Sequence, residues 1–181
     1  SSDLVLLRMG HGSYKNENDI YDLTLAQAWE DWFKVSHTIR VDLTAVKSPL
    51  RSLEFSTLKI KDAICDRFLD QFKLRPSVNT RTPDMRIAGF VDAHNFTVYL
   101  DTSGEALFKR GWREDTGEAP LKETLAAAML AAAGWRGRPE DGPLLDPCCG
   151  AGTIPIEAAQ IACGIAPGLQ RRFAFERLLP F

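Results

Sequence analysis

Hydrophobic positions divide the first part of the chain into alternating helical and extended segments. Apolar residues recur at helical spacing over 19–33 and, more strongly, over 52–72, so both segments predict amphipathic helices. Alternation of apolar and polar residues over 38–46 predicts a strand with one wet face. Two alternating runs around a DAHN turn in 85–104 predict a β-hairpin, and 106–114 predicts a further strand rich in basic and aromatic residues.

The second part of the chain follows a polar stretch near 114–119, which we interpret as a domain boundary. A strongly helical segment, 121–134, ends at a glycine, the usual left-handed helix stop. A short buried strand is expected over 143–146, then a glycine-bearing turn and a helix over 153–164. This order is typical of the opening of a doubly wound parallel sheet, so the predicted fold class is α/β in both parts.

Composition and charge change this picture only locally. The 181 residues are 45% hydrophobic and 25% charged, as in an ordinary globular protein. No run approaches the roughly 20 apolar residues that span a bilayer, and the start lacks both an initiator Met and a leader, so we expect the inside of a longer chain. The net charge is −2, yet 34–113 carries 14 Lys or Arg against nine Asp or Glu. This excess suits a phosphate-binding face, with a solvated surface as the alternative.

The four cysteines do not predict a metal site. Cys65, Cys148, Cys149 and Cys163 form no CxxC pair, and two adjacent cysteines cannot easily chelate one ion together. No histidine lies near them in the sequence. We therefore expect no metal, and cysteines without a framework spacing suit a reducing cytoplasm.

The stretch LLDPCCGAGTIPIEAA, residues 144–159, carries the strongest chemical signal. It reads as a strand ending in Asp146, a turn with Gly150 and Gly152, and a helix that starts at Thr153. Glycines allow a ligand to approach the backbone, and the helix start offers free N–H groups. The pattern is neither GxGxxG nor GxxxxGK[ST], which disfavours dinucleotides and triphosphates. An acid before this turn suits a ligand with a cationic amino-acid end, such as S-adenosylmethionine; a purely structural corner is the alternative.

This stretch closely resembles the first motif of class I, Rossmann-type S-adenosylmethionine methyltransferases that methylate amino groups. APLKETLAAAML, 119–130, looks like the helix that packs beside the cofactor in the same enzymes. Residues 56–114 resemble a THUMP domain, an RNA-binding module. The order of the three is similar to that of bacterial 23S rRNA guanine-N2 methyltransferases, often described as N6-adenine DNA methylases.

The resemblance implies a set of cofactor-binding residues and leaves the catalytic residues unknown. It implies Asp146, Pro147, Cys148, Gly150, Ala151, Gly152 and Thr153 in the turn, with Lys122, Glu123 and Thr124 at the upstream helix. The family often has Ser at position 151, and Glu157 is expected to anchor its helix rather than to touch cofactor. The Asn/Asp-Pro-Pro-Tyr/Phe motif that holds the target amine in the family does not occur in the chain, and neither does the acid that binds the ribose.

The resemblance also implies a domain organisation. Residues 1–18 are expected to be the tail of a ferredoxin-like subdomain, 19–114 the THUMP domain and 115–181 the truncated start of a Rossmann-like methyltransferase domain. The expected RNA-binding residues are basic ones within or beside the THUMP-like part, namely Lys59, Lys61, Arg75, Arg81, Arg86, Lys109, Arg110 and Arg113.

The predicted function is therefore that of an internal part of an rRNA methyltransferase, inactive by itself. The whole enzyme would transfer a methyl group from S-adenosylmethionine to guanine N2 of 23S rRNA, without a metal or a membrane. Two alternatives stay open: an RNA-binding module with an incomplete cofactor fold, and an N6-adenine DNA methylase.

Overall fold

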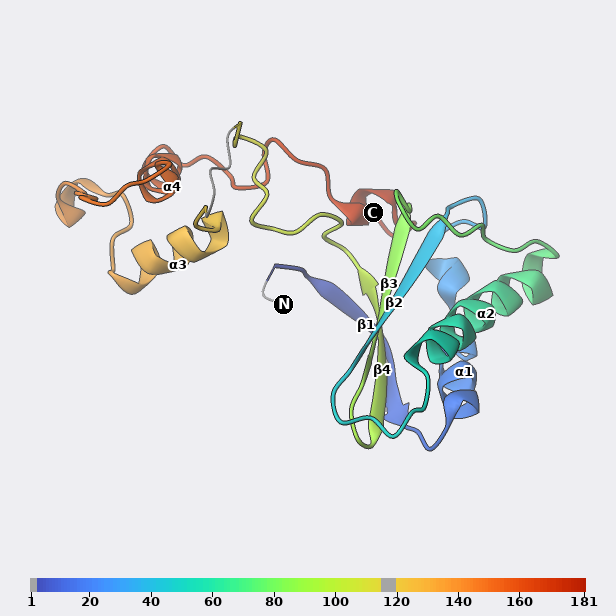
Figure 1. The fold of residues 1–181 in the computed structure, drawn as a ribbon. Coiled ribbons are helices and arrows are strands. Elements are labelled where there is room, and N and C mark those ends of the chain that lie inside the picture. Colours follow the sequence, from blue (N-terminus) through green and yellow to red (C-terminus); the bar gives the residue numbers. More distant parts are fainter. Residues whose placement is uncertain (1–2, 115–119) are drawn as a thin grey trace. The chain divides into compact units, whose positions relative to one another are not determined.

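The computed structural model describes residues 3–114 and 120–181 (Figure 1). The chain forms two compact units. The sheet unit consists of Leu4–Gly104 with Phe173–Phe181, and the helical unit consists of Glu105–Arg172 with Asp3. Residues 115–119, where the domain boundary was expected, lie outside the described residues. No helix among the described residues is both long and apolar enough to cross a membrane.

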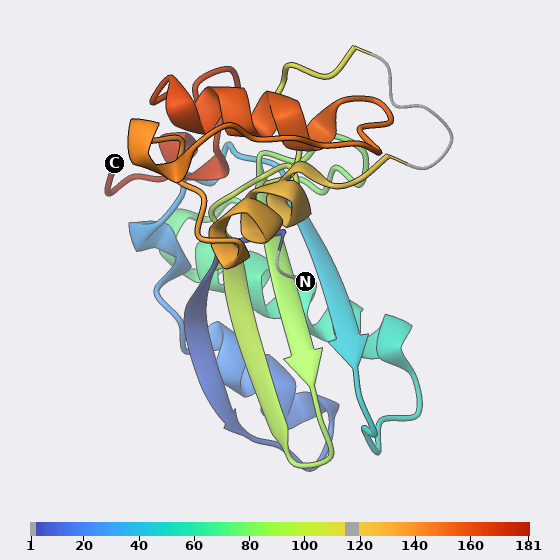
Figure 2. The ribbon, with the colours of Figure 1, turned by 90° about the vertical axis from the view of Figure 1, so that its left-hand side faces the viewer.

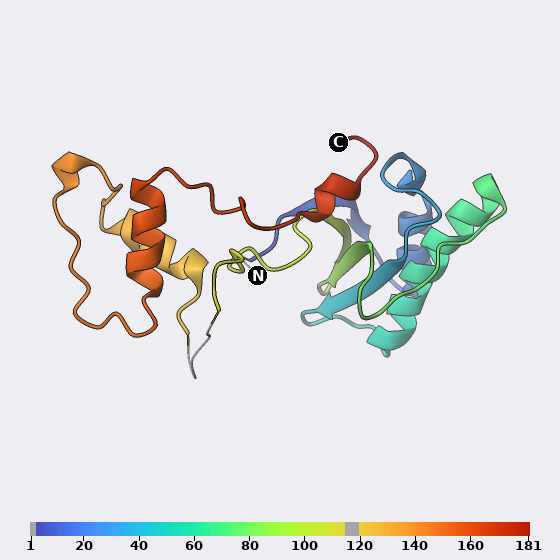
Figure 3. The same cartoon turned by 90° about the horizontal axis from the view of Figure 1, so that it is seen from above.

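The sheet unit is a four-stranded sheet with two helices packed on one of its faces (Figures 2 and 3). The strand order is β1-β4-β3-β2; β2 runs parallel to β3, and the other neighbours are antiparallel. The elements are β1 Leu6–Ser13, α1 Glu17–Leu25, β2 Ile39–Ala45, α2 Leu53–Phe72, β3 Met85–Val91 and β4 Asn95–Asp101, with short 3-10 turns at Trp29–Asp31 and Ala174–Arg177.

The core of the sheet unit lies between the sheet and these helices. Alternate residues of the strands, such as Ile87 and Val98, point inward and are buried. Aromatic rings pack together within this core, where the ring centroids of Phe33 and Phe68 lie 5.1 Å apart. Helix α2 approaches the sheet so closely at Gly89 that an added Cβ would lie 3.0 Å from a methyl group of Ile60, and it would also lie 2.7 Å from a methyl group of Leu43 on β2. Those contacts explain why a glycine stands within β3.

Most elements predicted for this unit are confirmed, including the long helix α2, the strand β2 and the hairpin β3–β4; the parallel pairing of β2 with β3 was not predicted. The start of the chain differs from its expectation as the tail of another subdomain. There, β1 pairs along β4, with Leu6 opposite Asp101 and Ser13 opposite Asn95, and so belongs to the same sheet. Because the two strands are far apart in sequence, no local pattern reveals this pairing.

The helical unit contains α3 Glu123–Ala132, α4 Thr153–Ala162 and a 3-10 turn at Pro139–Asp141. The strand expected over 143–146 is an unpaired segment, because the described part of this unit offers it no neighbouring strand, and an isolated strand has no partner for its backbone groups. The strand expected over 106–114 is irregular as well. Two of its basic side chains, Arg110 and Arg113, form buried ion pairs instead of lying along the surface of a strand.

The ion pair between Glu30 and Arg67 in the sheet unit predicts that the stability of the fold decreases in acid. Burial alone would raise the pKa of Glu30, but hydrogen bonds from Arg67 and Gln71 lower it below its ordinary value. A lowered folded-state pKa stabilises the fold above the unfolded value, about 4.3 for Glu, and this stability is lost as the pH falls through the folded pKa. We expect Glu30→Gln to be less stable than wild type by about 1 kcal/mol at pH 7. Chemical denaturation across pH 7 to 3 checks this: the difference should shrink below pH 4, and a difference constant across pH would contradict it.

Candidate functional site

The glycine turn of the helical unit combines an open backbone with an acid, Asp146, that has one buried oxygen. Gly150 has φ +52° and Gly152 has φ +78°, the left-handed region that favours glycine. An added Cβ at Gly150 would meet nothing within 4 Å. Helix α4 then starts at Thr153 without a side-chain cap, so the first N–H groups of the helix are left for another acceptor.

Asp146 faces this turn with one satisfied and one unsatisfied oxygen. Its Oδ1 accepts a hydrogen bond of 3.1 Å from the backbone N–H of Cys148. Its Oδ2 is buried and has no hydrogen-bond partner among the described residues. A buried carboxylate oxygen left unpaired costs free energy unless a donor is supplied from elsewhere. The position therefore suits a cationic or N–H-bearing ligand group.

The cysteines of the turn form no disulfide among the described residues. Cys148 and Cys149 are exposed free thiols, and Cys163 is likewise exposed and free. Within the described ranges, no group of three or more His, Cys, Asp or Glu residues could hold a metal ion.

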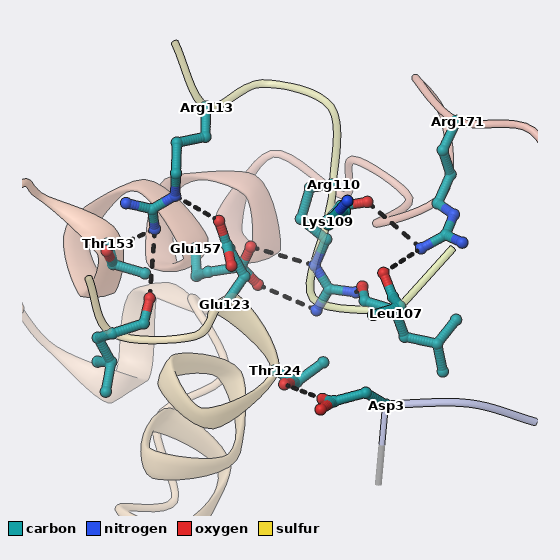
Figure 4. A network of polar contacts seen from close by, with 12 residues as sticks. Asp3, Leu107, Lys109, Arg110, Arg113, Glu123, Thr124, Thr153, Glu157 and Arg171 are labelled. Atoms are coloured by element: carbon teal, nitrogen blue, oxygen red, sulfur yellow. Dashed lines mark hydrogen bonds and ion pairs between the residues drawn. The ribbon is translucent and has the colours of Figure 1, made fainter. Parts of the chain in front are cut away.

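Arg113 joins the start of α3 to the start of α4 (Figure 4). Its Nε donates to Glu123 Oε1 at 2.7 Å, and its Nη2 donates to Thr153 Oγ1 at 2.8 Å. Nη2 also lies 3.3 Å from the carbonyl oxygen of Leu121. The side chain of Arg113 is 13% exposed and that of Glu123 is 3% exposed, so this ion pair is buried. One guanidinium thus fixes the upstream helix relative to the glycine turn.

A second buried pair lies beside the first. Nε and Nη2 of Arg110 face the two carboxylate oxygens of Glu157 at 3.3 and 3.4 Å, and Nη1 donates to the carbonyl of Leu107 at 3.1 Å (Figure 4). Glu157 lies one helical turn after Thr153. It anchors α4, as the sequence suggested. Removing one partner of such a buried pair leaves an uncompensated charge, which is strongly destabilising.

The side chain of Asp3 contacts residues at the start of α3. Asp3, which is buried, accepts from Lys122 Nζ at 2.8 Å, and Thr124 Oγ1 lies 3.4 Å from its other oxygen. Lys122 Nζ also lies 5.1 Å from the ring centroid of Phe108. A pocket of about 350 Å³ opens beside Lys122, Glu123 and Phe108.

The predicted cofactor residues therefore fall into two neighbouring groups. Asp146 to Thr153 form the turn, and Lys122 to Thr124 form the start of α3 and the pocket wall. Arg113 connects the groups through Glu123 and Thr153. The turn residues do not line the pocket. The connection depends on side chains far apart in sequence, and no local signal could have revealed it.

The expected RNA-binding residues separate according to their partners. Arg110 and Arg113 have a different role from the one predicted, because their guanidinium groups are committed to buried carboxylates. Several others pair with surface acids: Lys61 with Asp62, Arg75 with Asp66, and Lys109 with Glu105. Lys59 lies over the rings of Tyr21 and Phe55. Lys59, Arg81 and Arg86 form no ion pair among the described residues.

Comparison with known proteins assigns both units. Residues 14–101 match the THUMP domain family, and residues 110–180 match the family described as RMKL-like, methyltransferase domain. The chain is 44% identical, over 97% of its length, to Ribosomal RNA large subunit methyltransferase K/L of Pseudoalteromonas atlantica, and 46% identical, over 90% of its length, to the Aeromonas hydrophila protein of that name. It covers 25% and 23% of those proteins, so it spans about a quarter of their length.

Solved structures agree with this assignment. A predicted N6-adenine-specific DNA methylase from Listeria monocytogenes matches 97% of the chain with a TM-score of 0.82 and 35% identity, and the chain covers 45% of it. SMU.472, a methyltransferase solved in complex with SAH, matches 97% of the chain with a TM-score of 0.84 and 32% identity, and the chain covers 46% of it. Residues 14–101 of the chain therefore belong to the THUMP domain family, and residues 110–180 belong to the RMKL-like methyltransferase domain family.

Proposed function

We propose that the protein carrying this chain transfers a methyl group from S-adenosylmethionine to an exocyclic amine, guanine N2, of 23S rRNA. The observation that carries the proposal is the unpaired, buried Oδ2 of Asp146 beside an open glycine turn, in a chain whose relatives are named rRNA methyltransferases. The proposal assigns RNA binding to the THUMP domain and cofactor binding to the helical unit. An rRNA substrate also favours a cytoplasmic location.

The residues of the turn fit the chemistry of this cofactor. Asp146 Oδ2 is an acceptor without a donor, which suits the methionyl ammonium group. The uncapped start of α4 suits the methionyl carboxylate, and the open side of Gly150 leaves room for the sugar. When bound, S-adenosylmethionine supplies a methyl group activated by a sulfonium leaving group. The chain's part is to hold and orient it, and position alone contributes much of the rate in such a displacement.

The upstream residues support this site indirectly. The Glu123 carboxylate is held by Arg113, and Lys122 and Thr124 are held by Asp3. We propose that Lys122 to Thr124 set the position of α3 beside the turn. Of these three, Lys122 is the most exposed, with 53% of its side chain accessible, and is the one able to reach a ligand.

The substrate of the methyl transfer decides between this function and its alternatives. The THUMP match supports RNA, whereas the description of the Listeria relative names adenine in DNA. The test uses the protein that carries this chain at the length of its relatives, incubated with labelled cofactor and either undermodified 23S rRNA or duplex DNA. Nuclease digestion and mass spectrometry of the nucleosides then identify the methylated atom.

We expect label in 23S rRNA, as N2-methylguanosine, and none in DNA. N6-methyladenine in DNA would establish the methylase alternative instead. RNA binding without transfer to either nucleic acid would support a binding module with an incomplete cofactor fold.

A further inference from the structure

The sheet unit leaves one face of its sheet without a helix. Helices α1 and α2 both lie on the opposite face (Figures 2 and 3). The strand register then determines which side chains share the free face, since Arg8 of β1 and Ala88 of β3 both stand opposite Tyr99 of β4. Two residues from Tyr99 on β4, Thr97 stands opposite both His11 of β1 and Phe90 of β3. His11 Nδ1 lies 2.8 Å from Thr97 Oγ1. His11, Phe90 and Thr97 therefore share the free face with Tyr99.

Two aromatic rings of this face are arranged for stacking. Tyr99 is half-buried, and its neighbour on β3 is only a methyl group, that of Ala88. Phe90, 36% exposed, stands two residues after Ala88 on β3, diagonal to Tyr99. Diagonal cross-strand neighbours lie roughly 7–8 Å apart, within reach of two successive unstacked bases. Aromatic side chains on an open sheet are a general means of holding splayed bases of single-stranded RNA.

The charge of the same face suits a polyanion. Arg8 is exposed and Arg86 is half-buried, and neither forms an ion pair in the part of the chain that the structure describes. The acids of the face are engaged: Asp42 accepts from Arg40 Nη2 at 2.8 Å, and the buried Asp101 accepts from the backbone N–H of Ser103 at 2.8 Å. The free cations therefore flank the rings, while the two carboxylates of the face are already engaged.

We propose that this open sheet face binds single-stranded RNA, with bases stacked on Tyr99 and Phe90 and phosphates held by Arg8 and Arg86. The inference deepens the proposed function, because it rests on RNA being the partner of the THUMP domain. Single strands are favoured over duplexes because only unstacked bases offer their flat faces to an aromatic ring. The helical face of the same unit is less suited, since Lys61 and Arg75 are paired with acids there.

The test titrates the 181-residue chain into a fluorescein-labelled, unstructured 12-nucleotide RNA and follows fluorescence anisotropy at several salt concentrations. Tyr99→Leu and Phe90→Leu each keep an apolar side chain, and each should weaken binding roughly tenfold. Arg8→Gln and Arg86→Gln should each reduce the salt slope of the logarithm of the binding constant by about 1. The matched controls, Phe55→Leu and Lys61→Gln, lie on helix α2, on the other side of the sheet. Both should bind like wild type.

The proposal is overturned if both leucine variants bind like wild type, if only Lys61→Gln weakens binding, or if the chain does not bind the RNA. A hairpin duplex of equal length should bind more weakly and should not respond to Tyr99→Leu; equal sensitivity of both forms would contradict stacking. Since the titration contains no cofactor, it can succeed while the methyl-transfer proposal fails. Conversely, if the protein methylates rRNA but neither Tyr99→Leu nor Phe90→Leu weakens RNA binding, the methyl-transfer proposal stands and the stacking proposal fails.

Discussion

Gly150→Val should greatly weaken cofactor binding by the protein that carries this chain. The glycine has φ +52°, and the space where its Cβ would lie is empty within 4 Å, so in the free protein the new side chain meets no atom. In the proposed complex that space lies against the bound cofactor. Filling a close-packed contact in this way should weaken binding of S-adenosylhomocysteine by roughly 100-fold or more. Isothermal titration calorimetry measures the loss, and methyl transfer should fall with it.

Gly134→Val is the matched control for backbone strain. Gly134 has φ +75°, nothing lies within 4 Å of its added Cβ, and it follows helix α3 in the same unit. A β-branched residue is strained at either position, at a cost of about 1–3 kcal/mol, so the two variants should lose similar stability. Only Gly150→Val should lose cofactor affinity. Equal affinities in the two variants would exclude the turn from the cofactor site.

Local patterns predicted the sheet unit well because its strands and helices carry their own signals. The hairpin β3–β4 alternates inward residues such as Ile87 and Val98 with outward ones such as Tyr99, around a tight turn. Helix α2 repeats its apolar residues every three or four positions. The place of β1 in the sheet carried no such signal, because its pairing with β4 depends on distant residues.

The helical unit was predicted less completely for a physical reason. Residues 106–114 contain basic and aromatic side chains that suit an exposed strand, yet Arg110 and Arg113 turn inward to Glu157 and Glu123. Such a pairing depends on where two helices begin, not on local periodicity. The strand over 143–146 has its apolar residues but no neighbour among the described residues, and Leu145 is 85% exposed. An extended segment becomes a strand only when another strand pairs with it.

Only part of the candidate site could likewise be predicted from the sequence. The turn was identifiable because Asp146, Gly150 and Gly152 form one short motif, and its assignment to a cofactor remains a prediction. The acceptor without a donor at Asp146 and the clamp made by Arg113 emerged only from the arrangement in space. Asp146 faces the turn that leads into α4, and the clamp holds Thr153, the first residue of α4, so binding and stability are expected to be coupled there.

Amide hydrogen exchange, read by mass spectrometry in the 181-residue chain, can separate that clamp from ordinary surface charge. Peptides from α3 and α4 report on the helical unit, and peptides from α2 in the sheet unit serve as the internal reference. The control substitution is Arg138→Met, whose guanidinium is 52% exposed and pairs with the exposed Glu140 and with Asp141, and Asp141 keeps its hydrogen bonds from the backbone N–H groups of residues 136 and 138. It should leave the protection of α3 and α4 close to wild type, because exposed ion pairs contribute little.

Arg113→Met should strip α3 and α4 of most of their protection. The substitution leaves the Glu123 carboxylate, 3% exposed, without a counter-ion, and removes the donor to Thr153. Breaking a buried ion pair from one side costs about 3–5 kcal/mol, a large part of the stability of a small domain. Adding Glu123→Gln removes the stranded charge, so the double variant should recover much of the protection. If the double variant is no better than Arg113→Met, the loss comes from packing of the arginine stem, and the ion pair is not what holds the two helix starts together.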